Sequence, residues 1–334
     1  MTEVVSKKEE LVFSGVQPSG KMVHLGNYLG AMKRFVELQS SFPTTFCIVD
    51  LHALTSFKSK EELEENSLSL AAAFIATGID PEKSALFRQS DIPEVTELTW
   101  YLTTQFPLGL LERAHAVKDA RARGESPNSG LLFYPILMAA DILLPRATKV
   151  PVGADQKQHL EMAREIAQKF NLQFGEIFQV PEPMIAEETA SITGLDGRKM
   201  SKSYDNYIGL FESPKEIRKK VMRIVTDSKG VEDIKDPDTC NVFKIYRLLA
   251  TASQIEELRG RYLSGGMGYG YAKEELFKVV EELVAPMRET YLGLIARPDD
   301  LKDILRSGAR KLRPRSLETL DKVRDVLGIG AKLL

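Results

Sequence analysis

Apolar and polar positions follow two different patterns along the first half of the chain. Short apolar runs that stop at turn residues or charges are typical of buried β-strands. Such runs occupy residues 11–15, 46–49, 85–87 and 149–152. Stretches with apolar residues three and four positions apart are typical of amphipathic helices. They occupy residues 27–39, 59–77 and 95–104. Strands that alternate with helices predict a doubly wound α/β fold around a mainly parallel sheet.

After residue 205 the pattern is helical throughout. Residues 213–216 combine a serine, a proline and a glutamate in the order of a helix N-terminus. Further helical stretches occupy residues 242–250, 254–259, 272–289 and 316–327. We expect Pro286 to break the third of these, and the glycine-rich residues 265–270, which follow no strand, to form a loop. The chain therefore predicts an α/β domain at residues 1–204 and an all-helical domain at residues 205–334.

The composition is that of a soluble globular protein, with 43% hydrophobic and 28% charged residues among 334. A formal net charge of -2 argues against an unspecific binder of nucleic acid, so DNA is not an expected partner. Cys47 and Cys240 lie far apart and match no metal-binding spacing. Residues 2–10 are polar, and the sequence shows no apolar signal and no membrane-length run. We expect a cytoplasmic protein without a membrane partner.

The loop after the first strand carries glycines and a lysine in the order G-x-x-x-x-G-K at residues 15–21. A P-loop has this order but continues with Ser or Thr, whose hydroxyl binds Mg²⁺, whereas Met22 follows here. The next helix also starts several residues too late, near Asn27. The P-loop interpretation is therefore the weaker one. Parallel sheets still bind ligands at the carboxyl ends of their strands, where the loops after Gly15 and Val49 lie.

Two short motifs suggest a site for ATP. Residues 24–27 (His-Leu-Gly-Asn) precede a helix whose N-terminus favours phosphate, and His24 and Asn27 can donate hydrogen bonds to a phosphate that gains charge. Residues 199–203 (Lys-Met-Ser-Lys-Ser) place Lys199 and Lys202 among small residues, which suits a loop that closes on a polyphosphate. Taken singly, the first motif is more often a surface histidine and the second a solvated basic loop. Together and in this order they resemble the HIGH and KMSKS signatures of class I aminoacyl-tRNA synthetases.

Longer segments between about Phe13 and Asp227 resemble bacterial tryptophanyl-tRNA synthetases. The matching segments are residues 14–20, 26–31, 47–53, 130–132, 134–143 and 150–159. The resemblance implies a Rossmann-like catalytic domain, a helical anticodon-binding domain and a homodimer. It also implies that L-tryptophan and ATP form tryptophanyl-AMP, which then charges tRNA(Trp). Mg²⁺ is expected to arrive with ATP rather than to occupy a metal site of the protein.

Asp141 is the only charge in the apolar helical stretch at residues 134–144. A carboxylate in an apolar wall needs a partner, and Asp141 could simply be salt-bridged or lie at a helix end. The resemblance implies instead that it accepts the indole N–H of tryptophan, which is a donor only. The other tryptophan-binding side chains that it implies are Phe13, His52, Tyr134, Met138, Val150, Val152 and Gln156. An ordinary core role fits the four apolar members, Phe13, Met138, Val150 and Val152, almost equally well.

The resemblance assigns the catalytic contacts to His24, Asn27, Lys199 and Lys202. The ATP-binding residues that it implies are Gln17, Pro18, Ser19, Gly26, Asn27, Gly153, Ala154, Asp155, Ile192, Lys199, Met200, Ser201, Lys202 and Ser203. On chemical grounds, Gly26 would let the ATP ring approach the backbone. Asp155 could instead be only the N-cap of the helix that follows it.

Residues 113–121 depart from the family pattern. Ala116 stands where many members have a substrate-side glutamine, and Ala120 stands where they have a second phosphate-reaching lysine. Arg121 is a candidate to supply the missing charge, and His115 the missing polar contact. These departures leave room for a non-catalytic or regulatory paralogue. A tyrosine-specific synthetase, which shares both motifs and differs around Asp141, is the other alternative.

Basic residues gather in the helical half, in two clusters. The first cluster is Lys215, Arg218, Lys219, Lys220 and Arg223, and the second is Arg306, Arg310, Lys311, Arg313 and Arg315. Charge runs of this kind are usually solvated faces. In a chain that resembles a synthetase, we expect them to contact the phosphates of the tRNA anticodon arm.

Overall fold

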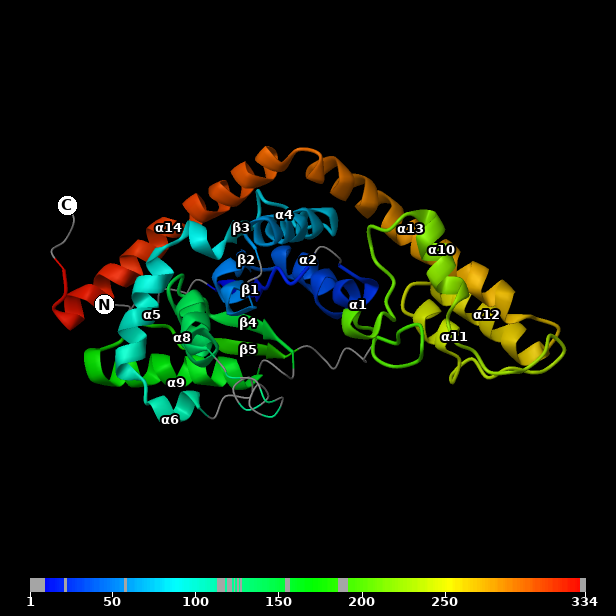
Figure 1. The fold of residues 1–334 in the computed structure, drawn as a ribbon, viewed down its shortest axis with the longest axis horizontal. Helices are drawn as coiled ribbons and strands as arrows, with labels where there is room; N and C mark the ends of the chain where they lie inside the picture. Colours follow the sequence, from blue (N-terminus) through cyan, green and yellow to red (C-terminus); the bar gives the residue numbers. More distant parts are fainter. Residues whose placement is uncertain are drawn as a thin grey trace, which may run out of the picture.

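The computed structural model describes residues 10–330, with gaps at 21–22, 57–58, 113–117, 119–121, 123, 125, 127, 154–156 and 186–191. Five parallel strands form one sheet in the order β3-β2-β1-β4-β5 (Figure 1). Their bounds are β1 Val12–Val16, β2 Thr44–Ile48, β3 Ala85–Arg88, β4 Lys149–Val152 and β5 Glu182–Ile185. This topology confirms the predicted doubly wound α/β class.

Helices cover both faces of this sheet. Successive residues of a strand point to opposite faces, and in β2 both sets are apolar, so each face needs a covering layer. Phe46 and Ile48 pack in a core that includes side chains of the helices α2 and α4. Their neighbours Cys47 and Val49 pack on the other side, in a core that includes side chains of α5, α8 and α9. The helices of this part are α1 Leu25–Asn27, α2 Lys33–Gln39, α3 Asp50–Ala53, α4 Lys60–Ala76, α5 Glu94–Gln105, α6 Leu108–Leu111, α8 Ser129–Leu143 and α9 Lys157–Phe174. A π-helical turn, Tyr28–Met32, joins α1 to α2, and short 3₁₀ turns lie at Leu54–Ser56, Gln89–Asp91 and Lys202–Tyr204.

The helical part extends to one side of the sheet (Figure 1). It contains α10 Pro214–Met222, α11 Asn241–Tyr246, α12 Ala252–Ser264 and α13 Tyr269–Ile295, and α14 Pro298–Leu327 follows them in the chain. As predicted, α10 begins with a capping box between Ser213 and Glu216 and has proline at its first position. The core that holds Phe46 continues into this part through Phe243, Tyr262 and Leu276, so the two parts share one hydrophobic cluster.

Helix α14 returns from the helical part to the sheet and covers the free edge of β3 (Figure 1). A Cβ added to Gly308 would lie 1.9 Å from the carbonyl oxygen of Leu86, so only glycine allows this close approach. Arg313 and Arg324 of α14 form ion pairs with Glu94 and Glu97 of α5. The predicted division after residue 204 stays a prediction, and α14 lies on the α/β part rather than among α10–α12.

Several elements differ from the sequence-based expectations. The helix expected at residues 316–327 begins at Pro298, and the helix expected at residues 242–250 ends at Tyr246. Strand β5 was not expected, because Glu182–Ile185 has only four residues and begins with an exposed glutamate, so it does not form an apolar run. The expectation that Pro286 breaks its helix was wrong, since α13 continues to Ile295. The packing of α13 against α4, α10 and α11 offsets the hydrogen bond that the proline removes.

Candidate active site

The carboxyl ends of β1 and β4 border a cavity of about 290 Å³. The two strands pair only at Val12 and Lys149, near their amino ends, and therefore separate where ligands bind in doubly wound sheets. Six of the side chains predicted to hold tryptophan line this cavity: Phe13, His52, Tyr134, Met138, Asp141 and Val150. Val152 is buried in the core that β4 shares with α8 and α9, and Gln156 lies outside the described residues. The structure thus brings together residues from β1, α3, α8 and β4.

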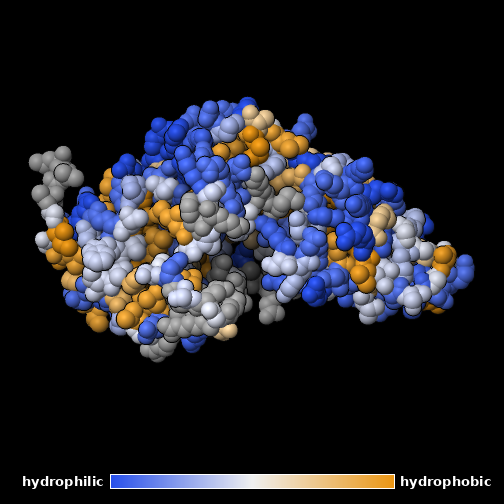
Figure 2. All heavy atoms as spheres, viewed as in Figure 1, coloured by the Kyte–Doolittle hydropathy of each residue, from blue (hydrophilic) through white to orange (hydrophobic). Residues whose placement is uncertain are grey.

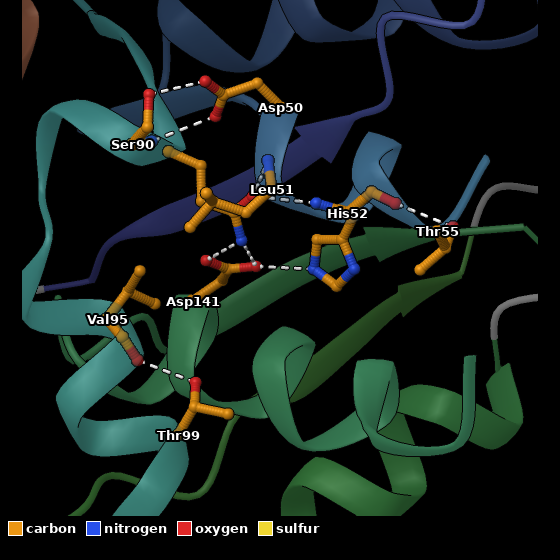
Figure 3. A network of polar contacts seen from close by, with 9 residues as sticks. Asp50, Leu51, His52, Thr55, Ser90, Val95, Thr99 and Asp141 are labelled. Carbon is orange, nitrogen blue, oxygen red and sulfur yellow. Dashed lines mark hydrogen bonds and ion pairs between the residues drawn. The ribbon is translucent and has the colours of Figure 1, made fainter. Parts of the chain in front are cut away.

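Asp141 supplies a buried carboxylate to the cavity wall, with its side chain only 4% exposed. Its Oδ2 atom accepts a hydrogen bond from His52 Nε2 at 3.0 Å, and Figure 3 shows the two side chains facing each other. Gln89 Nε2 lies 2.8 Å from each of the two carboxylate oxygens. A carboxylate offers about four acceptor positions, so Asp141 retains capacity for one more donor.

Two opposing influences act on the ionisation of Asp141. Burial raises the pKa of this carboxyl group above its ordinary value, because a low-dielectric surrounding disfavours the charge. The hydrogen bonds from His52 and Gln89 oppose that rise, since both donate to the ionised form. The hydrogen bonds from His52 and Gln89 therefore favour the ionised form of Asp141 against the effect of burial.

His24 caps the first helix, α1, and its ring is fixed by that role. Its Nδ1 atom accepts a hydrogen bond from the Asn27 N–H at 3.2 Å, and Asn27 Oδ1 accepts one from the His24 N–H at 3.2 Å. Because Nδ1 accepts, the neutral ring carries its proton on Nε2. Burial, followed by the charges of Lys202 and Lys220, lowers the pKa of His24 to about 4. At neutral pH the ring is therefore an uncharged donor through Nε2–H, and Asn27 keeps its Nδ2 hydrogens for a ligand.

The loop that carries Lys199 and Lys202 is folded around the buried side chain of Asn206. Asn206 Oδ1 accepts a hydrogen bond from the Ser201 N–H at 2.8 Å. Its Nδ2 donates to Asp196 Oδ1 at 2.6 Å and to the Lys199 carbonyl at 3.1 Å. The side-chain amide thus fixes the backbone beside both lysines.

The two sequence motifs meet in space. The N–H of Leu25 donates to the Ile208 carbonyl at 2.8 Å, which joins the first motif to the chain just after the second. Lys202 Nζ lies 3.6 Å from the position that a Cβ would take on Gly20, in the loop after β1. Burial lowers the pKa of the Lys202 ammonium, and a partly desolvated cation in this position favours an anionic ligand.

The predicted ATP-binding residues differ in burial and do not all line one cavity. Gln17, Pro18 and Ser19 line a cavity of about 160 Å³ beside α3 and α4. The Ile192 carbonyl accepts from the Met200 N–H at 2.8 Å, and the Met200 side chain is buried, so Met200 offers a ligand only its backbone. Lys199, Ser203 and Gly153 are exposed, and Ser201 is half-buried. Ala154 and Asp155 lie outside the described residues, as do His115, Ala116, Ala120 and Arg121.

Gly26 has a second reason to be glycine, besides the approach of ATP that the sequence suggested. A Cβ on Gly26 would lie 3.0 Å from His24 Nδ1 and 3.1 Å from His24 Cε1, and it would touch the Cβ of Met200 in the lysine loop. These contacts are tighter than ordinary packing distances, so a larger residue would displace the imidazole. Gly26 therefore makes room for the ring and for the lysine loop.

Comparison with known proteins identifies the family. Residues 6–285 match the family described as tRNA synthetases class I (W and Y). A tryptophan–tRNA ligase from Fusobacterium nucleatum is 48% identical over 317 residues, which cover 95% of this chain and 97% of that protein. A tryptophan–tRNA ligase from Campylobacter jejuni is 48% identical over 318 residues, covering 95% and 99%. The crystal structure of the Campylobacter jejuni synthetase complexed with ADP and tryptophan superposes with a TM-score of 0.92, covering 96% of this chain and all of that one.

The chain belongs to the bacterial-type tryptophanyl-tRNA synthetases.

Within this family framework, the sequence motifs missed two amide side chains, Gln89 and Asn206. Gln89 directly follows β3, and polar residues at the carboxyl end of a parallel strand are candidates for a site. Asn206 follows the lysine motif closely, but nothing in its sequence context shows that its side chain is buried. His159 was quoted only as part of a matching segment, yet it lines the cavity and forms a hydrogen bond with the Tyr134 hydroxyl.

The two basic clusters differ in the structure. In the first, Lys215, Lys219 and Arg223 are exposed on and just after α10, and Figure 2 shows a largely hydrophilic face over this helix. In the second, Lys311 donates to the Pro81 carbonyl and Arg313 pairs with Glu94. The second cluster therefore helps to hold α14 on the α/β part, and these contacts weaken the prediction that it binds RNA phosphates.

In the part of the chain that the structure describes, no helix has both the length and the apolar character needed to cross a bilayer.

Proposed function

We propose that the protein is a cytoplasmic tryptophan–tRNA ligase that first activates L-tryptophan with ATP and then transfers the tryptophanyl group to tRNA(Trp). The observation that carries this proposal is the buried carboxylate of Asp141 in the cavity at the carboxyl ends of β1 and β4, and its support is that the His24 and Lys202 loops meet near the loop that follows β1. Asp141 would then accept an indole N–H, and His24, Asn27 and Lys202 would donate to a triphosphate, all at the carboxyl-end side of the same sheet. The family membership supports the same reaction.

In the first step, a carboxylate oxygen of tryptophan attacks the α-phosphorus of ATP, and the bond to the pyrophosphate leaving group breaks. Mg²⁺ accompanies ATP as part of the substrate. The neutral His24 donates from Nε2 and Asn27 from Nδ2 to the α-phosphate as its charge grows. Lys202 offers its ammonium to the phosphates that leave. Positioning and electrostatic stabilisation supply most of the rate in such phosphate chemistry.

Asp141 would select tryptophan by accepting the indole N–H. A phenylalanine ring offers no such donor and would leave the acceptor direction unpaired in a buried wall, which costs about 1–3 kcal/mol. Phe13, Met138 and Val150 would then contact the apolar ring faces. The cavity of about 290 Å³ lies at the small end of the range for ligand sites, as suits one amino acid.

In the second step, a hydroxyl of the terminal ribose of tRNA attacks the activated carbonyl, and AMP leaves. We propose that the helical part centred on α10–α13 binds the anticodon arm. Its support is the exposed basic residues Lys215, Lys219 and Arg223, since phosphate contacts position RNA. Neutralising these three residues should weaken tRNA binding without changing tryptophan activation.

We also propose a homodimer, with one face of the α/β part as its interface. Trp100 is 66% exposed, and Leu54 and Leu108 are about half exposed. Leu51, Leu54, Phe133 and Leu137 line an adjoining cavity of about 480 Å³. Large exposed apolar side chains and an apolar cavity on one part of a protein commonly mark a protein contact. Sedimentation of Trp100→Glu should show monomer if this face is the interface.

The decisive experiment is ATP–pyrophosphate exchange with tryptophan, with tyrosine and without an amino acid. Exchange with tryptophan alone, followed by charging of tRNA(Trp), is the expected result. Exchange with tyrosine would move the assignment to the tyrosine-specific alternative. No exchange with either would favour a non-catalytic paralogue and direct attention to residues 113–121.

A further inference from the structure

Gln89 lies behind the cavity wall and connects two of its parts, α3 and α8, through one buried side chain, which is 1% exposed. Its Oε1 atom accepts hydrogen bonds from the backbone N–H groups of Leu51 at 3.0 Å and His52 at 3.3 Å. Its Nε2 atom lies 2.8 Å from both carboxylate oxygens of Asp141. Leu51, His52 and Asp141 surround this contact in Figure 3. One amide therefore joins the end of β3 to the start of α3 and to the last turn of α8.

The backbone donors fix which way the amide points. The first N–H groups of a helix lack partners within it, and here the start of α3 directs those of Leu51 and His52 at Gln89. Only the carbonyl oxygen of the amide can accept them, so its NH₂ group must face Asp141. The backbone of α3 thus fixes the orientation of the Gln89 amide, and that orientation lets its NH₂ group donate to Asp141.

A neighbouring contact holds the same two loops together, which leaves Gln89 little freedom to move. Asp50, the first residue of α3, accepts hydrogen bonds from the Ser90 N–H at 3.0 Å and from the Ser90 hydroxyl at 2.5 Å (Figure 3). The loops after β2 and β3 are therefore joined at adjacent positions. Asp141 receives its donors from these loops, through His52 and Gln89.

A role limited to capping α3 would need only the Oε1 atom. The NH₂ group adds something else, because it spans both oxygens of Asp141 and sets the plane of the carboxylate. Because Gln89 and His52 occupy the other acceptor positions of Asp141, the direction from which a further donor can approach is fixed. A polar group is most selective when its partners are fixed before the ligand arrives. We infer that Gln89 is a specificity-determining positioning residue, whose amide orients Asp141 to receive the indole N–H. This inference rests on the proposed function.

The test compares tryptophan with 3-benzothienylalanine, in which sulfur replaces the indole N–H at nearly the same shape. In ATP–pyrophosphate exchange, Gln89→Met should lower kcat/KM for tryptophan by about 10- to 100-fold, mainly through KM, because a hydrogen bond to a charged group is lost. The preference for tryptophan over the sulfur analogue should fall by about tenfold or more, while KM for ATP stays within about twofold. Gln89→Glu, which keeps the shape but sets a second carboxylate against Asp141, should lose more than Gln89→Met.

Gln39→Met is the matched control. Gln39 also accepts from a backbone N–H, that of Asp80, at 2.9 Å and donates to the Gly78 carbonyl at 2.7 Å, but it is the last residue of α2 and joins that helix to the segment before β3. Its replacement should lower thermal stability without changing the preference between the two amino acids. A merely structural role for Gln89 would give the same pattern as this control.

A double-mutant cycle with Asp141→Asn tests whether Gln89 acts through Asp141. In that background, Gln89→Met should change the preference by less than about twofold, because the group that it positions has already been altered. A folded Gln89→Met or Gln89→Glu protein with an unchanged preference would overturn the inference, and so would an equal effect in both backgrounds. If the wild type shows no exchange with tryptophan, the proposed function fails instead. Thermal stabilisation by tryptophan, compared between wild type and Gln89→Met, then decides whether Gln89 tunes binding alone.

Discussion

The imidazole of His24 should titrate far below the range of an ordinary histidine. Burial, and then the ammonium groups of Lys202 and Lys220, lower its pKa from 6.5 to about 4. At pH 6, about 1% of the His24 rings would then carry a second proton, compared with about three-quarters of ordinary histidines. The uncharged ring can therefore keep accepting from Asn27 through Nδ1 and donating through Nε2 well below neutral pH.

Replacing Lys202 by methionine tests this account of the shift. The variant loses one of the two charges that lower the pKa, but it keeps burial, which is the largest cause. We therefore expect the pKa of His24 to rise toward 6.5 without reaching it, and Lys220→Met to produce a smaller rise. The assay is the NMR titration of protein labelled with ¹³C at histidine Cε1. The chain has only four histidines, and His24→Asn identifies the signal.

The same shift predicts how stability depends on pH. The unfolded chain binds the proton near pH 6.5 and the folded chain only near pH 4, so the unfolded state holds more protons between these values. Stability should fall as the pH drops through this window, by up to about 3 kcal/mol for this one group. His24→Asn keeps a good N-cap residue but loses the titration, so it should lose less stability over the same range. A His24 signal that titrates near 6.5, or one that does not move in Lys202→Met, would refute the reasoning.

Three further substitutions test the site and the fold. Asp141→Ala should raise KM for tryptophan by about 100-fold with little change in KM for ATP in the exchange assay, and an equal loss of both would contradict its assigned role. Asn206→Ala removes the support of the lysine loop and should lower kcat for activation by about 10- to 100-fold at a nearly constant KM for tryptophan; a variant with normal kcat would show that the loop holds its shape without it. Gly308→Ala sets a Cβ 1.9 Å from the Leu86 carbonyl oxygen and should cost about 1–3 kcal/mol in urea unfolding. Gly293→Ala, which meets nothing within 4 Å, is its control and should be neutral or slightly stabilising.

The alternation of apolar runs and amphipathic stretches predicted the α/β class and four of the five strands, because strands buried on both faces read as continuous apolar runs. It could not find β5, whose four residues at a sheet edge include an exposed glutamate and therefore form no continuous apolar run. It also misjudged Pro286, since the cost of a proline inside a helix is visible in the sequence, while the packing that offsets it is not.

The sequence predicted the residues of the site that belong to a short motif. It did not predict the side chains that hold those residues in position. His24 and Lys202 came from short motifs, and the structure brings their loops together. Gln89 and Asp141 are 52 positions apart, and no local pattern indicates that they touch. Likewise, the basic run that includes Arg313 suggested RNA contacts, whereas its partner Glu94 is 219 positions away. Charge is visible in a sequence, but the identity of the group that neutralises it is not.

The position of α14 against β3 has a consequence for how the chain is made. Glu94 and Glu97 acquire their partners Arg313 and Arg324 only after 219 and 227 further positions have been synthesised. At translation rates of about 5–20 residues per second, the edge of β3 stays uncovered on the ribosome for roughly 10 to 40 seconds. Uncovered edge strands invite pairing with other chains, and a strand of only four residues limits that hazard. The nascent protein therefore covers this edge of its sheet only once α14 has emerged, and until then the shortness of β3 is what limits pairing with other chains.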